Sequence, residues 1–85
     1  MIEKTVQVGL QEGMEAAAQL VQVACQYKSE IRVSLDEKQV NAKSIMGVMM
    51  LGIATGESIV IQAQGEDEAE AVAGIEKVIR SGARQ

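Results

Sequence analysis

Apolar residues along this chain recur with two alternating spacings, and this alternation limits the folds that the chain can adopt. Every second residue is apolar through much of residues 2–10, 31–35 and 58–64, which is the spacing of a half-buried strand. Residues 15–27 and 67–81 instead show the spacing of an amphipathic helix. Asp36-Glu37 predicts a hairpin turn to a return strand at 38–42, and Ser44 opens a short helix. The predicted order is β-α-β-β-α-β-α.

This order favours an α+β fold, in which the helices cover one face of a largely antiparallel sheet of four strands. Ile59, Ile61 and Ala63 should point inward from the last strand. Asp67, followed by Glu70 three residues later, matches a capping box at the start of the last helix. Because the chain has 85 residues with no repeat or linker, we expect a single domain over residues 1–85.

Composition excludes several classes of function. The net charge is −4, and the basic residues are scattered with one Tyr as the only aromatic, so nucleic-acid binding lacks both a positive stripe and stacking rings. The first residues, MIEKTVQV, do not resemble a signal peptide, and no stretch approaches the roughly 20 apolar residues of a membrane span. The single Cys25 fits a reducing compartment, so we expect a cytoplasmic protein.

The absence of histidine argues against an enzyme. The chain has neither the commonest general base nor the partner of a Ser-His or Cys-His pair, and one cysteine cannot supply a zinc site. Glu66, Asp67, Glu68 and Glu70 could attract a cation, but helix capping already explains them. Cys25 beside a helical stripe is expected to be a partly buried, inert thiol. We therefore predict no catalytic residue, metal or cofactor.

Ser44 has two compatible interpretations. A serine at the start of a helix is expected to act as an N-cap, which stabilises by about 1 kcal/mol. The same place would also accept a phosphate group, because free backbone N–H groups and the positive end of the helix dipole favour negative charge there.

The methionine-rich segment after Ser44 also has two interpretations. Core packing is the simpler one, but Ile45, Met46, Met49 and Met50 are not expected to all point the same way in a helix. At least one or two should reach the surface, where flexible thioethers suit adaptable partner contacts. Gly47 in the middle of this helix predicts a close backbone approach.

The sequence NAKSIMGVM at residues 41–49, followed by LGIA at 51–54 and Gly56, resembles the regulatory-serine segment of the HPr family of phosphocarriers from the bacterial sugar phosphotransferase system. Alanine at position 42 makes it more similar to the Crh-like paralogues, which lack the active-site histidine. The resemblance extends to EKTVQV at 3–8, the helix ending at Tyr27, and QGEDE at 64–68. It implies the family's open-faced β-sandwich, βαββαβα, with three helices on one face of the sheet.

The resemblance also implies a function. In the family, an ATP-dependent serine kinase of the HPr type phosphorylates the serine, and the product binds a LacI-type transcription regulator as a corepressor in carbon catabolite repression. Ser44 would be the phosphoacceptor, and Ile45 and Met46 would contact the partner. Lys43 and Met49 complete the predicted docking residues.

The active loop departs from the family pattern. HPr proteins carry a G-[IL]-H-A-R-P-A loop, whose histidine accepts phosphate and whose arginine neutralises it and also helps to contact the regulator. Here residues 13–20 read GMEAAAQL, so Glu15 occupies the histidine position and the Arg-Pro pair is missing. Glutamate cannot form the phosphoimidazole, and in a first helical turn it also simply suits the helix dipole.

Three functional hypotheses follow. The leading one is a non-enzymatic regulatory protein that is switched by phosphorylation of Ser44. The second is a phosphocarrier component of the sugar phosphotransferase system, which the lack of histidine opposes. The third is an unphosphorylated homodimeric interaction module, because a shortened loop under strain can favour strand exchange.

Overall fold

The fold was analysed in a computed structural model, which describes residues 1–9, 14–53 and 56–81. The described elements run in the predicted order: β1 (Ile2–Gln7), α1 (Met14–Ala24), β2 (Glu30–Leu35), β3 (Lys38–Asn41), α2 (Ile45–Leu51), β4 (Ser58–Gln64) and α3 (Glu68–Ser81). The predicted apolar Leu10 lies outside the described residues.

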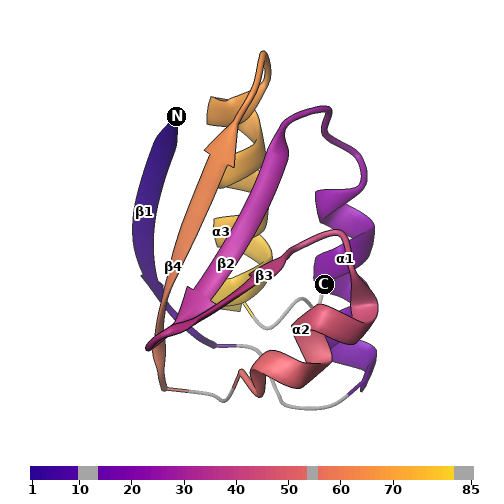
Figure 1. Cartoon of the computed structure of the whole chain (residues 1–85), viewed down its shortest axis with the longest axis vertical. Helices are drawn as coiled ribbons and strands as arrows, with labels where there is room; N and C mark the ends of the chain where they lie inside the picture. Colours follow the sequence, from indigo (N-terminus) through magenta and orange to yellow (C-terminus); the bar gives the residue numbers. More distant parts are fainter. Residues whose placement is uncertain (10–13, 54–55, 82–85) are drawn as a thin grey trace.

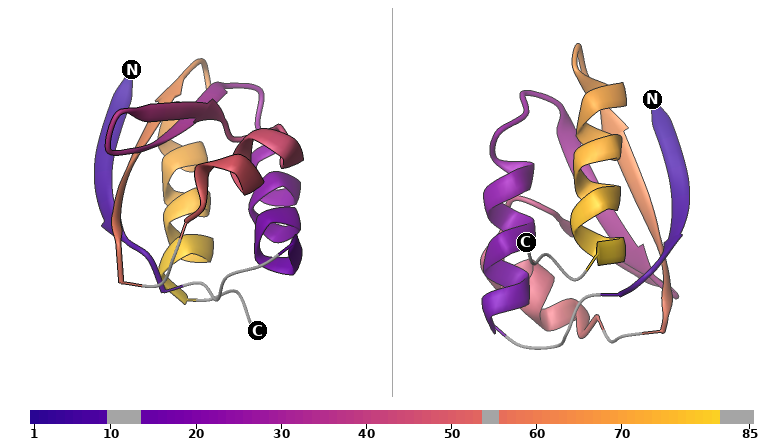
Figure 2. Two further views of the ribbon diagram at one scale, coloured as in Figure 1. Left: turned by 60° about the horizontal axis from the view of Figure 1, so that its bottom comes forward. Right: turned by 180° about the vertical axis from the view of Figure 1, so that it is seen from behind.

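The strands form one antiparallel sheet in the order β1-β4-β2-β3, and Figure 1 shows the sheet in front of α1 and α3. Seen from behind, α1 and α3 lie side by side across one face, and α2 lies near one end of the sheet (Figure 2). Figure 1 also shows that the opposite face carries no helix. The predicted α+β, open-faced sandwich is therefore confirmed.

The core between the sheet and the helices is aliphatic. Alternate residues of β2 and β4 point inward, with Ile31, Ile59 and Ile61 fully buried, as the two-residue spacing predicts. The stripe of α3 meets them from the other side through Ile75 and Ile79, which are also fully buried. None of the side chains described in this core is a methionine.

The first helix ends earlier than the spacing predicted. α1 stops at Ala24, and after one more helical bond from Cys25 N to Val21 O the pattern tightens. Gln26 N bonds to Val23 O and Tyr27 N to Ala24 O, which is the i to i−3 spacing of a closing turn. Cys25 lies in this turn and is exposed. The expectation of a partly buried thiol is therefore wrong, because residue 25 falls just past the face that α1 turns to the core.

The capping box predicted for α3 is also wrong in its side chains. The Asp67 carbonyl accepts the first helical bond from Ala71, but its carboxylate accepts from the backbone N–H groups of Lys28 and Ser29 at 2.8 and 2.9 Å and from the Ser29 hydroxyl. Glu68, rather than Glu70, reaches back to the Gly65 N–H at 3.1 Å. Asp67 thus joins two distant loops.

The turn at Asp36-Glu37 is confirmed, since Leu35 pairs with Lys38 across it. Asp36 adopts φ 57°, a left-handed conformation that tight hairpins require and that aspartate tolerates better than most residues.

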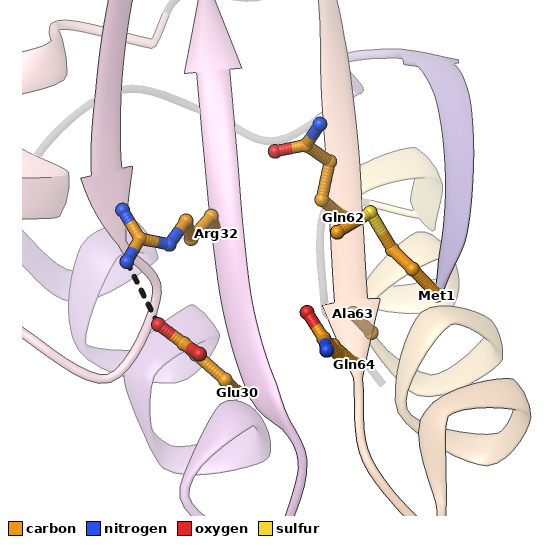
Figure 3. Close-up of a pocket in the computed structure, with 6 residues that line it drawn as sticks. All are labelled: Met1, Glu30, Arg32, Gln62, Ala63 and Gln64. Carbon is orange, nitrogen blue, oxygen red and sulfur yellow. Dashed lines mark hydrogen bonds and ion pairs between the residues drawn. The ribbon is translucent and has the colours of Figure 1, made fainter.

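A small hollow lined by described residues lies on the open face of the sheet. Figure 3 shows its lining, which is Met1, Glu30, Arg32, Gln62, Ala63 and Gln64. Its volume is about 30 Å³, and the Arg32 guanidinium is paired with the Glu30 carboxylate at 2.8 Å. A space of this size accommodates water rather than a small-molecule ligand.

Membrane-spanning helices and metal-binding clusters are both absent from the described parts of the chain. No helix there has the length and apolar character needed to cross a membrane. No three acidic or cysteine side chains there gather in an arrangement that could hold a metal ion.

Candidate functional site

Ser44 is the N-cap of α2, as the sequence predicts. Its backbone is extended, with φ −108° and ψ 114°, and its hydroxyl oxygen accepts a hydrogen bond from Gly47 N at 3.1 Å. Its carbonyl accepts the first helical bond, from Val48 N at 3.0 Å. The hydroxyl therefore satisfies one of the donors that a helix leaves free at its start. The Ser44 side chain is half-buried, so part of it faces solvent.

The chain enters this cap through a turn that Asn41 fixes. The Asn41 side-chain oxygen accepts from Lys43 N at 2.8 Å, and its carbonyl accepts from Ser44 N at 3.0 Å. Asparagine stabilises such turns by bonding the backbone two residues ahead. The last residue of β3 therefore sets the position of Ser44.

Lys43 does not extend freely into solvent. Its ammonium donates to the Tyr27 carbonyl at 2.7 Å, in the turn that closes α1. The last turn of α1 has no basic residue of its own, and a cation at this end complements the helix dipole. The residue before Ser44 thus links the cap of α2 to the end of α1.

The two faces of α2 differ clearly. Val48 and Leu51 are 4% and 2% exposed and join the core. Gly47 sits against β3, where a Cβ atom would lie 3.3 Å from the Cβ of Val40, which confirms the close approach predicted for this glycine.

The outward face carries the methionines. Met46, Met49 and Met50 are 68%, 44% and 75% exposed, and Ile45 is 36% exposed. At about 100° per residue, positions 46, 49 and 50 fall within an arc of about 100°, so these three side chains do share one direction. The prediction that some would reach the surface is confirmed, and core packing as their role is wrong.

Sequence reasoning missed Asn41 at this site, left Met50 out of the docking residues, and did not foresee the contact that Lys43 makes. Met50 is the most exposed side chain of α2, and a helical projection anchored on Val48 and Leu51 would have placed it outward. Asn41 could have been recognised as a turn residue at a strand end. No sequence signal connects Lys43 to the Tyr27 carbonyl, because the two are 16 positions apart.

Glu15, at the position of the family's histidine, lies in the first turn of α1, and its side chain is outside the described residues. The loop at residues 10–13 is outside them too. The described site therefore consists of Ser44, its cap and the outward face of α2.

A small open-faced α+β sandwich with an N-capping serine at the start of its second helix is the architecture that the sequence resemblance implied. Residues 2–81 match the family model described as the phosphorylation site of the HPr component of the phosphotransferase system. The chain belongs to the HPr family.

Within the family, the chain is similar to Crh proteins. It is 49% identical over 74 residues to the HPr-like protein Crh of Halalkalibacterium halodurans, covering 85% of this chain and 88% of that protein. It is 46% identical over 74 residues to Crh of Bacillus subtilis, covering 85% and 87%.

Solved structures agree with the fold. HPr from Thermoanaerobacter tengcongensis superposes with a TM-score of 0.90 at 40% identity, over 96% of this chain and 94% of that one. A crystal structure of Bacillus subtilis Crh gives a TM-score of 0.78 at 38% identity, with all of both chains covered, and is described as a dimer with a swapping domain.

Proposed function

We propose that this protein is a histidine-less, Crh-like regulatory member of the HPr family, which acts in carbon catabolite regulation through phosphorylation of Ser44. The observation that carries the proposal is a partly buried serine whose hydroxyl caps a helix start, directly beside exposed apolar side chains. Phosphate adds about −1.5 to −2 charges at this place and so changes which protein surface fits there.

The electrostatics of α2 support a phosphate on Ser44. The first turn of α2 carries no acidic residue, so none within that turn would repel the new charge. The backbone N–H groups and the dipole of the helix start favour it. The Lys43 ammonium belongs to the preceding residue, and it would have to leave the Tyr27 carbonyl to pair with the phosphate.

The apolar face beside Ser44 would supply the docking contact. Ile45, Met46 and Met49 lie at the surface, and Lys43 flanks them on the N-terminal side. A LacI-type transcription regulator is the proposed partner, by analogy with the family. The Arg-Pro pair that helps this contact elsewhere in the family is absent here, so the outward face of α2 would supply a larger part of the contact.

A phosphocarrier role has less support. Transfer from enzyme I requires a histidine that forms a phosphoimidazole, and the whole chain contains none. Glu15 at that position would repel an incoming phosphoryl group. We infer that the protein regulates rather than catalyses or relays phosphoryl transfer.

The test is incubation with ATP and a serine kinase of the HPr type, followed by mass spectrometry that locates the phosphate. The expected product carries one phosphate on Ser44, and Ser44→Ala remains unmodified. Incubation with phosphoenolpyruvate and enzyme I should leave the protein unmodified. Phosphate at another residue, or no phosphate with an active kinase, contradicts the proposal.

A homodimeric interaction module is the second candidate, and two observations favour it. β1 is an edge strand that pairs only with β4 among the described strands, and the Crh structure noted above is a dimer with a swapping domain. Size-exclusion chromatography over a range of concentrations should show a dimer fraction that grows with concentration. A monomer at every concentration excludes this candidate.

A further inference from the structure

The distribution of methionine in this protein is unusual, because none of the four methionines whose side chains the structure describes packs in the core. Met46, Met49 and Met50 occupy three of the seven positions of α2 and are 68%, 44% and 75% exposed. Met1, on the other side of the molecule from α2 in Figure 1, is 70% exposed. Methionine normally fills gaps in cores, whereas this core consists of other aliphatic residues.

We propose that the outward face of α2 is a reversible methionine-oxidation site, at which hydrogen peroxide converts Met46 and Met50, and more slowly Met49, to methionine sulfoxide. The chemical step concerns only this chain. Its regulatory effect rests on the docking role proposed for the same face.

The step is balanced without any other reactant. The thioether sulfur attacks one oxygen of the peroxide, the O–O bond breaks as the S–O bond forms, and a proton moves to the leaving oxygen to give water. Sulfur is oxidised by two electrons and the peroxide is reduced. In the reverse step a methionine sulfoxide reductase, supplied with a dithiol, removes the oxygen as water and leaves a disulfide on the reductant.

The geometry permits oxidation without unfolding. Susceptibility follows exposure, and the three thioethers project from the side of α2 opposite Val48 and Leu51, which hold the helix to the core. The added oxygens would therefore enter solvent, while the buried face stays unchanged.

The same geometry gives the oxidation a functional consequence. In the reduced state the three side chains form one flexible apolar stripe beside Ser44. A sulfoxide is polar, and burying it against an apolar partner surface without a hydrogen-bond partner is unfavourable. Oxidation would thus weaken docking beside Ser44, even though Ser44 itself is unaltered.

The first experiment measures the chemistry with no partner present. All proteins carry Cys25→Ser, since the exposed thiol also reacts with peroxide. Peptide mapping by mass spectrometry follows each methionine during treatment with hydrogen peroxide, with free methionine as the standard. Met46 and Met50 should react within about threefold of the free amino acid and ahead of Met49. The melting temperature should fall by less than about 4 °C.

The second experiment measures the consequence through phosphorylation of Ser44 by a serine kinase of the HPr type. Oxidation should lower the initial rate by about tenfold, and reductases for both sulfoxide epimers should restore it. The matched control is Met46→Leu/Met49→Leu/Met50→Leu, which keeps apolar side chains of similar volume that cannot be oxidised. Its rate should not change on peroxide treatment, although its Met1 is still oxidised.

The outcomes separate this inference from the proposed function. The modification site is overturned if Met46 and Met50 are oxidised more than tenfold more slowly than free methionine. It is also overturned if they are oxidised only as the protein unfolds. An unchanged rate of phosphorylation after oxidation, or an equal loss in the leucine variant, overturns the regulatory effect. If even the reduced protein is not phosphorylated, the proposed function fails and the regulatory effect fails with it, while the first experiment still decides the modification site.

Discussion

At the scale of single residues, Ser44 has a structural role and a proposed regulatory role through the same oxygen. The hydroxyl accepts from Gly47 N, while Asn41 and Lys43 hold the backbone on either side of the turn. A phosphate attached to that oxygen retains acceptor atoms near the same N–H groups. Modification and helix capping are therefore compatible.

The cap predicts the effect of removing the hydroxyl. Ser44→Ala should lower the free energy of unfolding by about 1 kcal/mol, because Gly47 N loses its acceptor. Urea denaturation monitored by circular dichroism would measure the change. Ser44→Asp is the control, since aspartate is an equally good N-cap and should stay within about 0.5 kcal/mol of the parent. Equal stability of parent and Ser44→Ala would show that the cap contributes nothing.

Lys43 gives a second prediction at this scale. Lys43→Met keeps the apolar stem but removes the charged donor to the Tyr27 carbonyl, and should cost about 1 kcal/mol in urea denaturation. Amide hydrogen exchange in the variant should accelerate first at the end of α1, because the Lys43 ammonium no longer binds the Tyr27 carbonyl there. Lys43→Arg retains a cationic donor and should lose less stability than Lys43→Met. Faster exchange confined to another element would argue against this link.

At the scale of elements, the order of strands and helices was predictable because each depends on the burial of nearby residues. Alternation in β2 and β4 and the stripes of α1 and α3 follow directly from one-sided burial. The N-cap at Ser44 was predictable because it is also local, since its hydrogen bond joins residues only three positions apart. The exposure of the α2 methionines was only partly predictable, because both faces of that helix are apolar.

The Asp67 bonds could not be predicted, because they connect residues 38 and 39 positions apart. Its carboxylate joins the start of α3 to the turn before β2, where Ser29 is 1% exposed. A local pattern, aspartate before an acidic helix start, suggested a capping box instead. The tertiary contact replaced the local one because it satisfies two backbone donors and a buried hydroxyl together.

These bonds predict a dependence of stability on pH. The Ser29 hydroxyl, followed by the Lys28 N–H, lowers the pKa of Asp67 below its ordinary value of 3.8. Since the folded pKa is the lower one, the stabilisation is complete above pH 3.8 and is lost as pH falls through the folded value.

The matching variant is Asp67→Asn, which cannot accept from all three donors. It should be less stable than the parent at pH 7, and the difference should shrink as the pH is lowered below about 4. Urea midpoints across this range would measure both. Glu70→Gln is the control, since the Glu70 carboxylate makes none of the hydrogen bonds described at the start of α3. If the stability difference between Asp67→Asn and the parent stays constant with pH, the Asp67 charge is not the source of that difference.

Gly9 gives a prediction about how elements join. Its N–H donates to the Ile79 carbonyl at 2.7 Å, and a Cβ atom there would lie 2.0 Å from the Arg80 carbonyl oxygen. Gly9→Ala should therefore force the chain after β1 away from the end of α3, and cost more than about 2 kcal/mol. Gly52→Ala is the control. That position has φ 70° and open space around it, so only backbone strain of about 1 kcal/mol is expected.

At the scale of the whole molecule, the fold is that of the HPr family, while the chemistry of histidine phosphotransfer is missing. The chain contains no histidine, yet it retains the helix start, the serine and the apolar face that follow β3. Family membership was predictable because those residues form one continuous sequence motif. The sequence-based expectation for the active loop has no structural counterpart, since residues 10–13 and the Glu15 side chain lie outside the described structure.

The most direct test of the central claim is mass spectrometry of the protein recovered from its host during growth on a rapidly used sugar and on a poor carbon source. Phosphate on Ser44, more abundant on the rapidly used sugar, is the result that a catabolite-responsive switch predicts. Phosphate on a different residue, or an unmodified Ser44 under both conditions, would contradict the claim.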